Sequence, residues 1–178
     1  ETQLDQLKNG EIDVLSAITG GELTKKALDV VNASEGGFTE NHYQRAGYGK
    51  IQFECDFGPT MFAEVRQAVA YVLNRNEFMQ SFTGGYGVVV DGPYSPDFSM
   101  WQAVKDTIKL TDYSYAPTKA QEVLEKGGWT YNSKGEKYVA GQTGVDAVRY
   151  KKLEGDALTD VNKAYKSVAN EDGTTYAT

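Results

Sequence analysis

Cysteine and histidine are almost absent from this sequence of 178 residues, which has one of each, Cys55 and His42. A single cysteine excludes an internal disulfide and any metal site built from a cluster of thiolates. The lone histidine has no second imidazole or carboxylate cluster with which to hold a metal ion, and no nucleophile stands recognisably beside it. We therefore expect no metal site, no cofactor and no catalysis by His42. We expect Cys55 to be a small buried residue of a strand.

Basic charge and long apolar runs are also scarce. The chain has 18 Lys and Arg against 25 Asp and Glu, which gives a net charge of -7. This balance disfavours nucleic acid as a partner, because phosphate binding needs a concentrated basic patch. No run of membrane-spanning length, signal peptide or lipidation motif is present. Since the first residue is Glu1, we interpret the chain as an excised piece of a larger protein, whose targeting stays open.

What is present is a globular composition, 40% apolar and 24% charged, in a chain of one-domain length. Residues 51–57, IQFECDF, alternate apolar and polar side chains, which predicts a half-buried strand. Helical spacing of apolar residues then predicts a helix over 62–73 with Thr60 as its cap. A second short helix is predicted with Asn76 as its cap and Gly84 at its end.

Other segments give local signals of the same kind. Tyr131 and Tyr138 flank turn residues, so 129–140 is predicted to form a hairpin. Leu158, Val161, Tyr165 and Val168 share one face of a predicted helix. The remaining predicted elements are a helix stopped by Asn9-Gly10, a strand at 11–15, helices at 22–31, 101–108 and 117–126, and a strand beginning at 173–178.

Three sequence segments resemble motifs of a known family: LKNGEIDVL (7–15), VRQAVAYVLNR (65–75) and YSYAPTKAQEVLEKGGW (113–129). Each resembles a motif of the family 5 extracellular solute-binding proteins, which serve oligopeptide, dipeptide and nickel ABC importers, and they occur in the family's order. Gly92-Pro93 resembles the turn that lines the mouth of the family's ligand cleft. The departures are Glu54 for asparagine, Ala116 for a capping aspartate and Gly127 for alanine. Residues 141–178 match no motif and are interpreted as an atypical insertion or extension.

The resemblance implies an α/β fold with a central mixed sheet flanked by helices, like one lobe of a type II periplasmic binding protein. Residues 1–178 would form a single domain, much of the second lobe, with the first lobe absent. The implied function is capture of peptides or other small solutes without chemistry, and their delivery to the membrane permease of an ABC importer. The implied location is extracytoplasmic, either periplasmic or lipid-anchored.

Candidate ligand contacts follow from the same resemblance and from side-chain chemistry. A tyrosine ring covers apolar side chains while its hydroxyl meets a backbone group, and an arginine pairs with a ligand carboxylate. Hydroxyls of the loop at 16–21, Ser16 and Thr19, are further candidates, although such a loop also caps helices. Trp101 has two interpretations, packing or ligand contact. The predicted ligand-binding residues are Tyr48, Arg45, Ser16, Tyr86 and Tyr94.

Two other functions stay open. A hydrolase could use the carboxylates of Glu54 and Asp56, but alternation places both on one strand face without a matched partner. A surface-exposed structural or adhesive domain would suit the twelve tyrosines. We expect a binding protein rather than an enzyme, with peptides, sugars and nickel complexes as its possible ligands.

Overall fold

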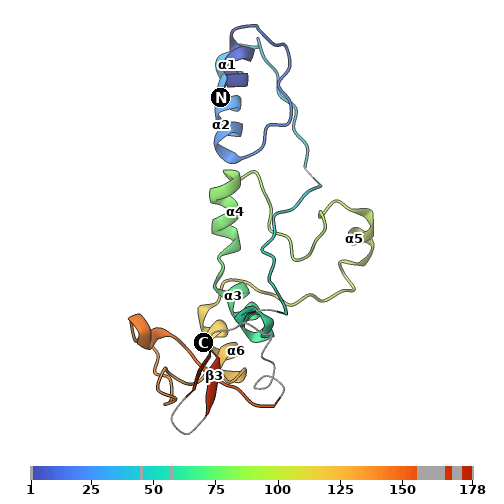
Figure 1. Ribbon diagram of the computed structural model, residues 1–178. Coiled ribbons are helices and arrows are strands. Elements are labelled where there is room, and N and C mark those ends of the chain that lie inside the picture. Colours follow the sequence, from blue (N-terminus) through green and yellow to red (C-terminus); the bar gives the residue numbers. More distant parts are fainter. Residues whose placement is uncertain (1, 45, 57, 156–166, 170–173, 178) are drawn as a thin grey trace. The chain divides into compact units, whose positions relative to one another are not determined.

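The structure is a computed structural model that describes residues 2–44, 46–56, 58–155, 167–169 and 174–177 (Figure 1). The chain divides into two compact units. The first unit comprises residues 1–49 and 74–112, and the second comprises residues 50–73 and 113–178.

In the described residues of the first unit, all regular secondary structure is helical. The unit contains α1 (Thr2–Lys8), α2 (Gly21–Ala33), α4 (Arg75–Thr83) and α5 (Ser99–Val104). Each helix predicted for this part of the chain is therefore present, although α5 ends at Val104 and not at residue 108. The predicted cap of α4 was wrong, because Asn74 and not Asn76 accepts a hydrogen bond from the Glu77 backbone N–H. Gly84 ends α4 in the left-handed region at φ 65°, as expected.

Helices α2 and α4 contact each other through two glycines. Gly21, the first residue of α2, is buried. A Cβ atom at this position would lie 2.3 Å from the Gly84 backbone N and 2.5 Å from its Cα. Neither backbone could move aside as a side chain would, so the two helix ends approach this closely only because both residues lack side chains.

The two strands expected near the centre of the fold are not observed. Residues 11–15 and the described residues of 51–57 form no strand. Alternation of side chains is a local property, whereas a strand exists only through hydrogen bonds to a partner, and no described segment pairs with either stretch. Cys55 is consequently exposed, and its expected burial was wrong.

The second unit begins with a 3-10 turn, η1 (Pro59–Met61), followed by α3 (Ala63–Val72). Thr60 does not cap α3, since it lies in η1, and its hydroxyl donates to the Glu54 carbonyl at 2.6 Å. Helix α6 (Pro117–Lys126) packs against α3. Ala116 provides no side-chain cap for α6, and its backbone N–H donates instead to the Tyr71 carbonyl of α3 at 2.9 Å.

The sheet is small and antiparallel, with the order β1-β3-β2. Its strands are β1 (Lys151–Lys152), β2 (Ser167–Ala169) and β3 (Thr175–Ala177), the last confirming the strand expected at the end of the chain. The prediction of a central mixed sheet flanked by helices is therefore wrong for the described residues. Val168 pairs with Tyr176 in this sheet and so lies in no helix, and its predicted helical neighbours Leu158, Val161 and Tyr165 lie outside the described residues.

The core of the second unit forms around Trp129. Trp129, Leu153 and Ala177 are buried and pack against Phe62, Val65 and Leu124. The rings of Phe62 and Trp129 meet edge to face, with centroids 5.5 Å apart. The hairpin that follows is confirmed by an isolated bridge between Tyr131 and Lys137. A 3-10 turn, η2 (Gly144–Ala147), precedes β1.

Candidate ligand-binding surface

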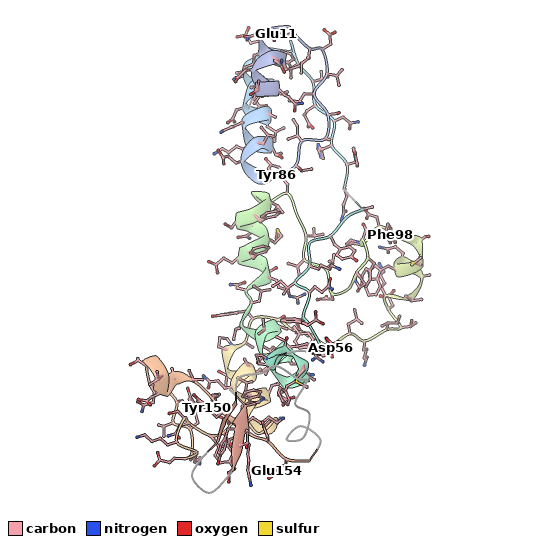
Figure 2. The ribbon with its side chains drawn as sticks, viewed as in Figure 1. Glu11, Asp56, Tyr86, Phe98, Tyr150 and Glu154 are labelled. Atoms are coloured by element: carbon pink, nitrogen blue, oxygen red, sulfur yellow. The ribbon has the colours of Figure 1, made fainter. Side chains whose placement is uncertain are left out.

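Four of the five predicted ligand-binding residues lie in the first unit, and Arg45 lies outside the described residues. Ser16 is exposed, and Tyr48 and Tyr86 keep 45% and 61% of their surface exposed. Tyr86, labelled in Figure 2, follows the end of α4. Such rings are free to cover an apolar group. Their role in binding stays a prediction.

Two hollows flank the contact between α2 and α4. One, of about 680 Å³, is lined by residues that include Thr19, Glu22, Lys26, Phe78, Ser81 and Phe82. The other, of about 490 Å³, is lined by residues that include Lys25, Asp29, Asn32 and Tyr86. Of the predicted residues, Tyr86 thus lines a hollow, whereas Ser16, Tyr48 and Tyr94 line neither of these two.

The larger hollow, which we call the phenylalanine hollow, combines apolar and polar walls. The rings of Phe78 and Phe82 are nearly parallel, at 6° with centroids 5.8 Å apart, and are 61% and 69% exposed. Lys26 and Glu22 form an ion pair at 2.9 Å. Sequence reasoning assigned no ligand role to the two phenylalanines, although their separation by one helical turn was a readable signal.

Tyr94 is held in the turn that contains the Gly92-Pro93 pair. Its ring stacks on that of Trp101, with centroids 4.3 Å apart. This contact agrees with the packing interpretation of Trp101. A Cβ on Gly92 would lie 2.1 Å from the ring of Tyr94. The hydroxyl oxygen of Tyr94 is buried and has no hydrogen-bond partner among the described residues. Burial and the charge of Asp91 raise the pKa of this hydroxyl, which therefore stays protonated at neutral pH.

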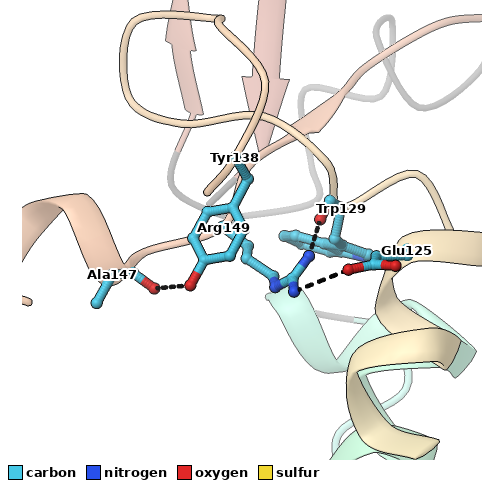
Figure 3. A network of polar contacts seen from close by, with 5 residues as sticks. All are labelled: Glu125, Trp129, Tyr138, Ala147 and Arg149. Carbon is cyan, nitrogen blue, oxygen red and sulfur yellow. Dashed lines mark hydrogen bonds and ion pairs between the residues drawn. The ribbon is translucent and has the colours of Figure 1, made fainter. Parts of the chain in front are cut away.

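In the second unit, Arg149 organises a polar network (Figure 3). Its guanidinium donates to the Trp129 carbonyl at 3.0 Å and to the Glu125 carboxylate at 3.2 Å. It also lies over the Tyr138 ring, 4.1 Å from the centroid. The Tyr138 hydroxyl donates to the Ala147 carbonyl at 3.4 Å. These contacts connect the hairpin to the end of α6 and have a structural role.

Glu64 of α3 is the other polar centre of the second unit. Its Oε1 accepts from the Trp129 ring N–H at 3.2 Å and pairs with the Lys151 ammonium. A Cβ at Gly127 would lie 2.4 Å from the Glu64 Cγ. The Glu64 side chain thus occupies the space of the alanine that the similar motif carries at this position, which explains this departure.

We expect the Glu64 contacts to make stability depend on pH. Burial alone would raise the pKa of Glu64, but hydrogen bonds and the charge of Lys151, with the Trp129 N–H, lower it overall. A lowered pKa stabilises the folded chain fully above the unfolded value of about 4.3, and this contribution is lost as the pH falls through the folded pKa. Urea unfolding of the wild type and Glu64→Gln should therefore differ by about 1–2 kcal/mol at pH 7, and less at pH 3. A difference that stays constant with pH would contradict this account.

The carboxylates proposed for a hydrolase are both exposed. A hydrogen bond with Asp56 and the charge of Asp56 raise the pKa of Glu54. In the described part of the chain, no group of three or more His, Cys, Asp or Glu residues could hold a metal ion. Within the same residues, no helix is long and apolar enough to cross a membrane.

Exposed aromatic rings beside hydroxyls are typical of a ligand-binding surface. The family model of bacterial extracellular solute-binding proteins, family 5 Middle, matches residues 1–171, and the chain belongs to this family. No curated protein and no solved structure gives a match. Members of the family bind solutes and pair with ABC permeases, so the chain is a solute-binding protein and not an enzyme.

Proposed function

We propose that this chain forms the ligand-binding lobe of a two-lobed receptor that captures oligopeptides outside the cytoplasmic membrane and delivers them to an ABC importer. The receptor would be periplasmic or lipid-anchored. The observation that carries the peptide assignment is the phenylalanine hollow, because it places aromatic rings next to hydroxyls and a balanced ion pair.

A peptide offers what such a surface requires. Its side chains supply apolar groups for the rings of Phe78 and Phe82, and its backbone supplies donors and acceptors for Thr19 and Ser81. Because the backbone is common to all peptides, hydroxyl and main-chain partners tolerate many side-chain sequences. Tyr48 and Tyr86 would extend the contact along the ligand.

Capture by two lobes couples affinity to their closure. A ligand that contacts both lobes favours the closed state by the difference in its affinity for the two states. A permease that recognises the closed state then accepts only loaded receptors. This chain alone would offer one side of the cleft, so we expect its own affinity to be weak or undetectable.

A thermal-shift screen with pooled di- to octapeptides tests this proposal. A peptide at one hundred times its Kd stabilises a receptor by about 2.7 kcal/mol, which at roughly 2 °C per kcal/mol raises Tm by about 5 °C. We expect this shift in the two-lobed receptor and not in this chain by itself. The receptor variant Tyr48→Ala should lose most of the shift. Tyr115→Ala is the matched control, because Tyr115 is 56% exposed and lies in the second unit.

Different results of the screen separate the proposals. If no peptide pool stabilises the receptor, the peptide assignment is wrong, and sugars and nickel complexes are tested next. If peptides stabilise the receptor and both tyrosine variants behave like the wild type, peptide capture stands and the assignment of Tyr48 is wrong.

A further inference from the structure

Arg75 joins the start of α4 to the chain segment that leads into the Gly92-Pro93 turn. A single guanidinium nitrogen, Nη1, donates to the Val90 carbonyl at 3.2 Å and to the Asp91 carboxylate at 2.8 Å. The Arg75 side chain is 28% exposed, whereas that of Asp91 is 53% exposed. Arg75 is therefore the partly buried member of the ion pair. Because it also donates to the Val90 carbonyl, it holds the backbone of the segment as well as the Asp91 side chain.

Gly87, at the start of this segment, packs closely against Thr83 of α4, but few hydrogen bonds hold the residues that follow it. Among the described residues, no backbone–backbone hydrogen bond involves residues 87–91. The following turn is fixed from its other side by α5, where Trp101 stacks on Tyr94 and the Gln102 side chain donates to the Pro96 carbonyl at 2.6 Å. Arg75 thus supplies side-chain hydrogen bonds to Val90 and Asp91, where the segment enters the turn.

We propose that Arg75 is a positioning residue that fixes the Gly92–Tyr94 turn in the arrangement that binds ligand. The role in binding rests on the proposed function. Without Arg75, residues 87–91 would sample more conformations in the free protein. A ligand would then have to order the turn as it binds, and this ordering lowers affinity.

Fluorine NMR of this chain labelled with 5-fluorotryptophan measures the positioning without any ligand. The chain has two tryptophans, and Trp101→Phe assigns their resonances. Trp101 reports the turn, and Trp129 reports the core of the second unit. In Arg75→Met, we expect the Trp101 resonance to move or broaden while the Trp129 resonance stays in place. Arg75→Lys should bring the Trp101 resonance part of the way back to its wild-type position, because the lysine ammonium keeps a hydrogen-bond donor and the positive charge.

Lys109→Met is the matched control, since it removes an exposed positive charge from the same unit and should leave both resonances unchanged. An unchanged Trp101 resonance in Arg75→Met would overturn the proposal. If Arg75→Met does not fold, Asp91→Asn decides in its place, because it removes the carboxylate and keeps the arginine. A Trp101 resonance that moves in Asp91→Asn supports the proposal, and one that does not move overturns it.

Affinity tests the binding part separately. For a peptide that the wild-type receptor binds, Arg75→Met should raise Kd by about fivefold to tenfold, and Arg75→Lys should recover part of the loss. An unchanged Kd beside a moved Trp101 resonance would overturn the role in binding. If the wild-type receptor binds no peptide, the proposed function fails, whereas the NMR result still decides whether Arg75 positions the turn.

Discussion

Replacing Trp129 with alanine is expected to lower the free energy of unfolding by about 3–5 kcal/mol, the range for large aromatic residues in a core. Trp129 is 4% exposed and packs against Leu153 and Ala177. The substitution removes the ring from Phe62 and deletes the N–H that donates to Glu64. Urea unfolding monitored by far-UV circular dichroism measures the loss.

The matched control is Trp101→Ala, which deletes the same side chain from a half-buried position in the first unit. We expect a clearly smaller loss there, because fewer buried contacts surround Trp101. If Trp129→Ala cost less than Trp101→Ala, the core would not lie where the structure places it.

Gly21→Ala is expected to have the second large effect. The added Cβ would overlap backbone atoms of Gly84 and Thr83 at 2.3–2.5 Å, so α2 and α4 must move apart. Overpacking of this kind costs about 1–3 kcal/mol. Hydrogen–deuterium exchange should show faster exchange in both helices, and the phenylalanine hollow between them should be lost.

Gly49→Ala controls for the change from glycine to alanine itself. A Cβ at Gly49 would meet no atom within 4 Å, and its φ is outside the left-handed region, so this variant should be neutral or slightly stabilising. Equal exchange rates in the two variants would contradict the close contact of α2 with α4.

The helices were predictable because their signals are local. Pro117 and Gly127 mark the beginning and end of α6, and Ala120 faces the core at 3% exposure. The cap of α4 was also readable: Asn74 and Glu77 have capping-box spacing, and the Asn74 amide donates to the Glu77 carboxylate at 3.1 Å. Asn76, the predicted cap, lacks this spacing, because Met79 stands three residues after it.

The strands and the candidate site were less predictable because both depend on residues far apart in sequence. Alternation in 51–57 indicated a strand, but no local pattern shows whether a partner strand exists. The phenylalanine hollow depends on the close approach of Gly21 to Gly84. The sequence predicts the two helices separately but does not show that their ends meet. The family motifs predicted the family correctly, since the family model matches residues 1–171.

Native mass spectrometry of the two-lobed receptor, purified without denaturation, tests the central claim most directly. The account predicts receptor carrying bound molecules whose masses and fragments are those of intact peptides, displaced by added peptide and released unchanged. Bound sugars or metal complexes that peptide does not displace would contradict peptide capture, and release of cleaved peptide would contradict binding without chemistry.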